Sequence, residues 1–256
     1  KYFGDQDPLG RTLRVNGEFD VRVSAVIKDI PAQSSLRFDA IVPFSLQFAP
    51  SFEVESTGAD ITVAQLGLDE LDLDPESATL VIIGPSKSFT DLEGVIVGNF
   101  VREGGVLLLA DDFGSANSLL EGMGASSRFT GDLVMDLAFE KQPEFSVCFD
   151  IREDPVTTNV TTVLMNYPSS LTIDPDASKA IAYSSIASWR DVNGNSLQDY
   201  GEPRGPFPVL ARESLGLGEI LLLSDPSVLI NGMGAHMDNR ALATNIIDEV
   251  SSERAE

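Results

Sequence analysis

The chain has 256 residues, of which 43% are hydrophobic, and its formal net charge at neutral pH is −23. This length supports one or two domains with a substantial core. So acidic a surface repels phosphate backbones, and the composition therefore argues against nucleic acid as a partner. Two explanations of the acidity stay open. One is a solvated surface suited to a salty medium, and the other is a surface that collects divalent cations.

The first segment, residues 1–48, has the pattern of a small antiparallel β segment. Asn16-Gly17 predicts a tight turn between its first two strands, and Pro31 ends the second strand. Three alternating runs predict the strands themselves, at residues 12–15, 20–28 and 38–43. A piece of this size is marginally stable alone, so it needs a partner surface.

Residues 1–10 read Lys-Tyr-Phe-Gly-Asp-Gln-Asp-Pro-Leu-Gly, followed by Arg-Thr-Leu-Arg-Val-Asn at residues 11–16 and Val-Ile-Lys-Asp-Ile-Pro at residues 26–31. These phrases resemble the periplasmic core domain of MacB-type, FtsX-like ABC transporter permeases. The resemblance covers under a fifth of the chain. It implies a location outside the cytoplasm, and it implies that the segment belongs to a transporter permease as one alternative function.

The body, residues 50–256, alternates buried strands with helices. Continuous apolar runs of strand length predict the strands, at residues 80–84, 106–110, 180–183, 208–211 and 219–223. Thr90 or Asp91 is expected to cap a helix whose apolar face consists of Leu92, Val95, Ile96 and Phe100. Further helices are expected at residues 115–123 and after Asp238. Strands joined by helices predict an α/β fold, with a mostly parallel sheet and helices on both faces.

Residues 128–175 are less regular, and we expect them to add antiparallel strands. Four stretches of the body carry a second resemblance, at residues 81–86, 100–114, 117–122 and 224–227. They resemble an uncharacterised archaeal family of membrane-anchored domains. That resemblance implies a class I glutamine amidotransferase-like or flavodoxin-like fold. It also implies an extracytoplasmic domain that is membrane-anchored in the parent protein through a segment outside this chain, with other membrane or envelope proteins as partners.

The residues for amidotransferase chemistry are missing from the body. That reaction needs a cysteine at a sharp strand-to-helix turn, activated by histidine, and the equivalent turn here carries Asp111-Asp112. Cys148 is the only cysteine and lies in an expected strand, where a small buried thiol is the ordinary explanation. His236 is the only histidine and lies in a glycine-rich loop. The sequence therefore predicts a protein that is not an enzyme.

The crevice at the carboxyl ends of the strands is the expected ligand position in an open α/β sheet. Polar residues that follow the strands are its candidates: Ser86, Lys87, Asp111, Asp112, Ser115, Asn117, Asp225 and Asn239. The alternative is that these side chains cap helices and turns. A degenerate hydrolase that uses crevice carboxylates stays open as a third function, and it predicts a carboxyl group with a raised pKa.

The sharpest local signal is the segment of residues 191–202. Oxygen-bearing side chains stand at positions 1, 3, 5, 9 and 12 of a twelve-residue loop, and Leu197 would offer its backbone carbonyl at position 7. The side chains are those of Asp191, Asn193, Asn195, Asp199 and Glu202. This register predicts Ca²⁺, with Ser196 at the position where EF-hand loops have glycine as one departure. The alternative is a polar surface turn.

Asn159-Val160-Thr161 matches the acceptor pattern for N-glycosylation. Taken together, the sequence predicts a non-catalytic extracytoplasmic binding or scaffold domain of a membrane-associated protein, stabilised by calcium.

Overall fold

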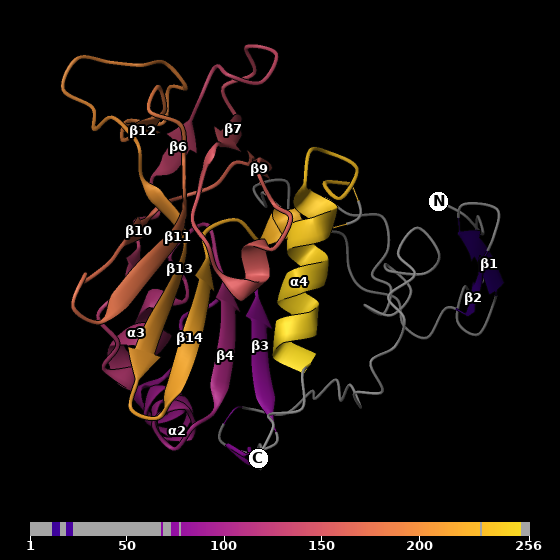
Figure 1. Cartoon of the computed structure of the whole chain (residues 1–256), viewed down its shortest axis with the longest axis vertical. Helices are drawn as coiled ribbons and strands as arrows, with labels where there is room; N and C mark the ends of the chain where they lie inside the picture. The colour runs from indigo at the N-terminus through magenta and orange to yellow at the C-terminus, as the bar shows by residue number, and fades with distance from the viewer. Residues whose placement is uncertain are drawn as a thin grey trace, which may run out of the picture. The chain divides into compact units, whose positions relative to one another are not determined.

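The computed structural model describes residues 12–15, 19–22, 68, 73–76, 78–230 and 232–251 (Figure 1). The chain divides into two compact units, residues 1–44 and residues 45–256. In the first unit, β1 (Thr12–Val15) pairs antiparallel with β2 (Phe19–Arg22). The first predicted strand is therefore confirmed, and the second is confirmed over its described part. The predicted turn at Asn16-Gly17 and the predicted strand at residues 38–43 lie outside the described residues.

The second unit contains a six-stranded sheet with the order β3-β4-β14-β13-β11-β8 (Figure 1). Each of the five apolar runs lies in one of its strands. The strands are β3 (Thr79–Ile83), β4 (Val106–Ala110), β8 (Asp150–Ile151), β11 (Ser178–Tyr183), β13 (Pro208–Leu215) and β14 (Gly218–Leu223).

Strand direction divides this sheet into two parts. β3 and β14 run parallel to β4, whereas the pairings β14–β13, β13–β11 and β11–β8 are antiparallel. The α/β class is confirmed, but the expectation of a mostly parallel sheet needs correction. The physical reason lies in the connection from β13 to β14, where Gly216-Leu217 forms a turn far too short for a helical crossover. An apolar run shows that a strand is buried on both faces, but it carries no information about direction.

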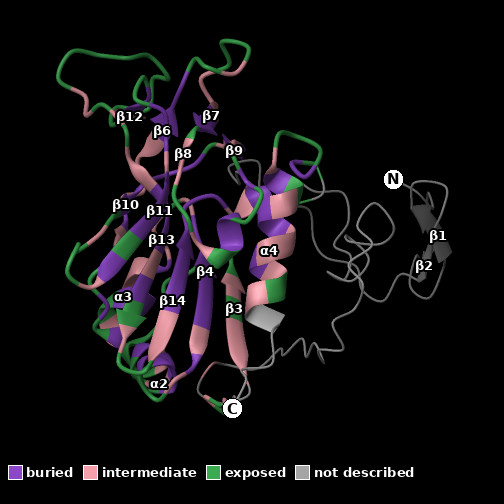
Figure 2. Ribbon diagram, viewed as in Figure 1, coloured by how far each residue is buried: buried purple, intermediate pink, exposed green. Residues whose placement is uncertain are grey.

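Alternate residues of the central strands face two separate cores. Leu107 and Leu109 of β4 pack with α2 (Asp91–Arg102) and α3 (Asn117–Met123), whereas Leu108 and Ala110 pack in the core that includes α4 (Asn239–Ser251). The neighbouring strand β14 alternates in the same way. Figure 2 shows these central strands largely buried. Helices therefore cover both faces of the sheet, as predicted.

Helix α2 begins where the sequence predicts. The backbone N–H of Glu93 donates to Thr90 Oγ1 at 3.3 Å, and the backbone N–H of Thr90 donates to Glu93 Oε2 at 2.7 Å. This reciprocal pair is a capping box, which satisfies two backbone donors at the start of the helix.

The buried face of α2 differs from the predicted face. Val97, Phe100 and Val101 are buried, but Leu92 and Val95 are 58% and 48% exposed. The reason is a close approach between α2 and α3, which glycine permits. A Cβ added to Gly94 would lie 2.6 Å from the Cα of Gly122. Because glycine has no side chain, the face that meets α3 is invisible to a search for apolar residues.

Residues 128–175 contribute short strands to antiparallel pairs, as predicted. The pairs are β5 (Arg128–Phe129) with β10 (Leu171–Thr172), β6 (Leu133–Met135) with β12 (Trp189–Asp191), and β7 (Phe145–Cys148) with β9 (Val163–Asn166). Strands β6, β7, β9 and β12 lie beyond the end of the sheet where β3, β4 and β14 end (Figure 1). Within the described part of the chain, no helix has both the length and the apolar character needed to cross a membrane.

Candidate functional site

Two aspartates follow the central parallel strands at the same edge of the sheet. β4 ends at Ala110, which pairs with Leu223, the last residue of β14. The backbone N–H of Asp111 then donates to the carbonyl of Leu223 at 3.1 Å. Because the two strands run parallel and end in register, Asp111-Asp112 and Asp225 come together, as the sequence predicts for a strand-end crevice.

Asp111 is used by the backbone that follows it. Its Oδ1 accepts the N–H of Phe113 at 3.1 Å, and its Oδ2 accepts the N–H of Ala116 at 2.7 Å. The side chain is 1% exposed. Both oxygens therefore hold the turn between β4 and α3, which is the capping role that the sequence left open as the alternative.

Asp225 is fully buried and also binds backbone donors. Its Oδ1 accepts the N–H of Ser227 at 2.8 Å and the Ser227 hydroxyl at 2.5 Å, and its Oδ2 accepts the N–H of Asn166 at 2.7 Å. Burial raises the pKa of Asp225 to about 6, and the charge of Asp112 adds to the rise, although these hydrogen bonds oppose it.

Asp112 is the partly exposed member of the group. Burial is again the main cause that raises its pKa to about 6, and the charge of Asp111 adds to it. Asp112 and Asp225 therefore titrate in the same range, and the charge of Asp112 contributes to the raised pKa of Asp225. Two carboxyl groups with a pKa of about 6 are suited to proton transfer at weakly acidic pH or to binding a polar group at the strand ends.

Cys148 lies close to Asp225, a position that the sequence did not predict. The thiol is fully buried, and burial raises its pKa well above the ordinary range, with the charges of Asp225 and Asp136 adding to the rise. A thiol in this state is protonated at neutral pH, so it is a poor nucleophile. Asp136 is a buried residue that sequence reasoning missed. Its oxygens accept the N–H groups of Ala138 and Val147 at 3.0 and 3.3 Å.

Two asparagines predicted for the crevice bind strand backbone instead. Asn117 Nδ2 donates to the carbonyl of Phe129 at 2.8 Å, and Asn117 Oδ1 accepts the Phe129 N–H at 2.9 Å. Asn239 makes the same pair of bonds with Leu164, at 2.7 and 2.9 Å. Each amide bonds to the N–H and the carbonyl of one residue, as the backbone of a paired strand would. Its oxygen and nitrogen are therefore already in use and are not available to a ligand.

The other predicted crevice residues and the histidine contribute little chemistry. Ser86 and Lys87 are exposed after β3, and Ser115 accepts the Ser118 hydroxyl through its backbone carbonyl. His236 is exposed in a turn before α4 and makes an edge contact with Phe139, with 6.0 Å between ring centroids. Of the predicted crevice residues, the structure therefore unites only Asp111, Asp112 and Asp225.

Residues 191–202 form an ordered loop that begins at the end of β12. Asp191 Oδ1 accepts the N–H groups of Gly194 and Asn195 at 2.9 and 3.1 Å, and its Oδ2 accepts the N–H of Ser196 at 2.7 Å. Ser196 has a φ of 58°, which is rare for a residue with a side chain. The first loop residue thus folds the chain around its own carboxylate.

Three further side chains of this loop converge on one point. The Nδ2 atoms of Asn193 and Asn195 lie 2.6 and 2.7 Å from Asp199 Oδ2. These hydrogen bonds lower the pKa of Asp199. Glu202 closes the loop, because its two oxygens accept the N–H groups of Val192 and Asp199, each at 3.0 Å. Among the described residues, no group of three or more His, Cys, Asp or Glu side chains is gathered as a metal site.

The fold and the strand-end aspartates define an α/β domain with a three-layer core and with acidic groups where its central strands end. The chain belongs to the family described as "Domain of unknown function (DUF4350)", whose model matches residues 53–247. No curated protein sequence matches the chain.

Solved structures resemble the chain at low sequence identity. The mmIFT52 N-terminal domain is 15% identical, with a TM-score of 0.53 over 70% of this chain and 79% of that chain. The cytoplasmic protein STM1381 from Salmonella typhimurium LT2 is 12% identical, with a TM-score of 0.44 over 68% of this chain and 72% of that chain. A β-galactosidase from Bacillus circulans sp. alkalophilus is 12% identical, with a TM-score of 0.39 over 66% of this chain and 22% of that chain. The first likeness supports the fold alone.

Proposed function

We propose that this chain is a binding or scaffold domain without a catalytic role, stabilised by Ca²⁺ in the loop of residues 191–202. The observation that carries the proposal is the arrangement of that loop. Oxygen side chains at positions 1, 3, 5, 9 and 12 surround a chain that Asp191 has already folded. Hard oxygen ligands in this register are those that Ca²⁺ prefers.

The backbone at the sixth loop position supports calcium. EF-hand loops have glycine there because the chain turns sharply, and positive φ is the conformation that glycine adopts most easily. Ser196 stands at that position with a φ of 58°. The departure noted in the sequence is therefore one of residue type and not of backbone shape.

A small rearrangement would present the ligands. The amide Nδ2 atoms of Asn193 and Asn195 now point at Asp199 Oδ2. A half-turn of each amide would direct its oxygen to the same point, and a cation would then replace the two N–H donors. The N–H groups of Asn195 and Leu197, which now donate to these amide oxygens at 3.1 and 2.7 Å, would exchange that acceptor for water. Glu202 would exchange its backbone donors for the cation, which a bidentate carboxylate at position 12 does in calcium loops.

The strand ends support the absence of catalysis. The carboxylate oxygens of Asp111 and Asp225 accept hydrogen bonds from backbone N–H groups. The Cys148 thiol is buried and protonated at neutral pH. A nucleophile that is both buried and neutral has neither access to a substrate nor the charge needed for attack.

Thermal unfolding of the full chain tests the calcium proposal. At a Ca²⁺ concentration about 100 times the dissociation constant, binding should stabilise the folded state by about 2.7 kcal/mol relative to EGTA. The double variant Asp191→Ala/Asp199→Ala should show no such shift, and the control Asp174→Ala/Asp176→Ala, in another exposed acidic turn, should retain it. An unchanged melting temperature in the wild type would leave the loop as a polar turn.

We further propose that the domain acts outside the cytoplasm, membrane-anchored in its parent protein, with other membrane or envelope proteins as partners. Its acidic surface and its resemblance to membrane-anchored domains with an amidotransferase-like fold support this setting. The alternative, an extracytoplasmic part of an ABC transporter permease, is supported by the antiparallel pairing of β1 with β2 in the permease-like segment. FtsX-like membrane helices in the same gene would favour that alternative.

A degenerate hydrolase is the second candidate, and one observation favours it. Asp112 and Asp225 both have a pKa of about 6, as expected of carboxyl groups that exchange protons near neutral pH. A panel of ester, phosphoester and glycoside substrates should then show turnover that rises or falls near pH 6 and disappears in Asp112→Asn. If wild type and Asp112→Asn give the same background rate on every substrate, this candidate is excluded.

A further inference from the structure

Asn159-Val160-Thr161 is an N-glycosylation triplet that occurs once in the sequence. It follows the short 3-10 helix η2 (Pro155–Thr157), at the edge of the core that includes α4. Such triplets are frequent by chance. Whether this asparagine can carry a bulky glycan depends on the exposure and the contacts of its side chain in the fold.

Asn159 is exposed, and the residues on both sides of it are anchored. Val156 and Val160 are buried at 0% and 7% exposure, while the Asn159 side chain has no hydrogen-bond partner among the described residues. Its φ is 59°, a conformation that asparagine tolerates better than most residues. The backbone therefore turns the Asn159 side chain outward.

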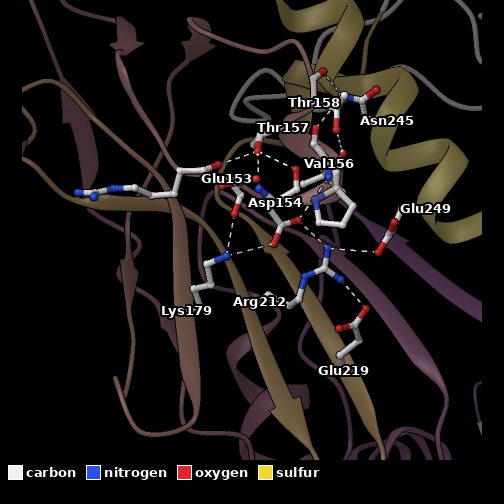
Figure 3. A network of polar contacts seen from close by, with 12 residues as sticks. Glu153, Asp154, Val156, Thr157, Thr158, Lys179, Arg212, Glu219, Asn245 and Glu249 are labelled. Atoms are coloured by element: carbon white, nitrogen blue, oxygen red, sulfur yellow. Dashed lines mark hydrogen bonds and ion pairs between the residues drawn. The ribbon is translucent and has the colours of Figure 1, made fainter.

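The turn is held from several elements of the fold (Figure 3). Asn245 on α4 donates through Nδ2 to the carbonyls of Val156 and Thr158, at 3.0 and 2.8 Å. Arg212 of β13 binds the carboxylate of Asp154, the N-cap residue of η2, at 2.8 Å, and Figure 3 shows this contact. Arg212 also meets Glu219 of β14 and Glu249 of α4, so η2 is tied to both the sheet and the helix.

Asp238 holds the other end of the triplet. Its Oδ2 accepts the N–H groups of Thr161 and Thr162 at 2.8 and 3.0 Å, and it accepts the Thr161 hydroxyl at 2.8 Å. None of these contacts involves the Asn159 amide. A group attached to that amide would therefore leave the folded state unchanged.

A shallow polar hollow of about 410 Å³ lies beside Asn159, lined by residues 151–154 and 157–160. Exposed charged and hydroxyl groups surround it, including Arg152, Glu153 and Thr158. Sugar hydroxyls form hydrogen bonds with groups of this kind. The first sugar of a glycan on Asn159 would have a polar surface to lie against.

We propose that Asn159 is the acceptor of an N-linked glycan. The Asn159 amide nitrogen attacks the anomeric carbon of a sugar carried on a polyprenyl phosphate or diphosphate. A C–N bond forms, the bond from that carbon to the phosphate oxygen breaks, the lipid phosphate leaves with the bonding electrons, and the amide loses one proton to a base of the transferring enzyme. The modification rests on the extracytoplasmic location proposed above, because such donors are presented on that side of the membrane.

The test is translation of the full chain, behind a cleavable signal sequence, in the presence of microsomes. The wild type should gain one glycan that an endoglycosidase removes. Asn159→Gln and Thr161→Ala should lose it, whereas Thr161→Ser and the neighbouring control Thr162→Ala should keep it. An unglycosylated wild type, or a glycan that persists in Asn159→Gln, would overturn the proposal.

The microsome experiment and the calcium measurement can fail separately. The signal sequence places the chain in the lumen, and calcium binding is measured on unglycosylated protein from bacteria. Intact mass of the protein from its own cells then tests the location: an unmodified mass there, together with a glycosylated chain in microsomes, would contradict the extracytoplasmic setting and overturn the proposal for the native protein.

Discussion

The strand ends and the loop of residues 191–202 use the same residue types in opposite environments. At the strand ends, Asp225 is fully buried and its pKa is raised to about 6. In the loop, Asp199 is exposed and hydrogen bonds from Asn193 and Asn195 lower its pKa. In both places, backbone N–H groups bind carboxylate oxygens.

The opposite pKa shifts of Asp225 and Asp199 arise from their different exposure to solvent and not from the number of hydrogen bonds that each carboxylate accepts. A buried carboxylate loses hydration that a few N–H donors only partly replace, so it retains a proton more readily. An exposed carboxylate keeps its charge at neutral pH and can exchange its donors for a cation at little desolvation cost. Asp112 and Asp225 at the strand ends therefore retain protons more readily, whereas the exposed Asp199 of the loop is suited to a metal.

The largest effect is expected from Asp225→Ala. The substitution leaves the half-buried N–H groups of Asn166 and Ser227 without an acceptor, whereas the Ser227 hydroxyl keeps the carbonyl of Asn166 at 3.4 Å. Because each unsatisfied donor costs roughly 1–3 kcal/mol, the free energy of unfolding should fall by about 4 kcal/mol. Urea unfolding at about pH 5 measures this loss, and the exposed Asp176→Ala is the control. A loss no larger than that of the control would show that the strand-end bonds contribute little.

A pH dependence of stability should distinguish the two regions. The pKa of Asp225 rises from 3.8 in the unfolded chain to about 6 in the folded state, so between these values the folded state binds the proton more tightly. The contribution of this residue is complete below about pH 4 and is lost as pH rises to about 6, which amounts to up to about 3 kcal/mol.

Asp225→Asn removes this titration. Its amide adds a constant offset, because Nδ2 faces a donor, but the offset does not vary with pH. The stability of Asp225→Asn relative to wild type should therefore improve by up to about 3 kcal/mol between about pH 4 and about pH 7. Parallel stability curves for the two proteins would show that Asp225 ionises normally.

Much of the fold could be predicted from the sequence, because buried strands and helix caps leave local signals. Thr90 and Glu93 identify the start of α2, and the apolar runs identify the central strands. Strand direction could not be predicted. The turn at Gly216-Leu217 identifies an antiparallel connection only when the ends of β13 and β14 on either side of it are known. The face of α2 that packs against α3 could not be predicted either. Gly94 and Gly98 make that contact, and glycine has no apolar side chain to mark a buried face.

The candidate site was predicted in part. Asp111, Asp112 and Asp225 directly follow two parallel strands that end in register. The apolar runs of those strands therefore allowed the prediction that these three residues lie close together. The roles of Asn117 and Asn239 were not, because each depends on a strand segment that is distant in sequence or irregular in pattern. Asp136 and Cys148 reach the group through β6 and β7, whose pairing no local signal predicts.

The smallest effect is expected from Asp199→Asn without calcium. Asp199 is exposed, and its carboxylate binds only the amides of Asn193 and Asn195, which water can replace. Thermal unfolding in EGTA should therefore be the same for the variant and the wild type. A clear destabilisation in EGTA would mean that the loop needs Asp199 for its fold, independently of any metal.

Isothermal titration calorimetry of the full chain with Ca²⁺ tests the central claim most directly. We expect one binding event per chain in the wild type and its loss in Asp199→Asn, a variant that should fold normally. The Asp112→Asn variant, altered at the strand ends, should bind Ca²⁺ as the wild type does. No heat of binding in the wild type, or equal binding by Asp199→Asn, would contradict the assignment of the loop as the calcium site.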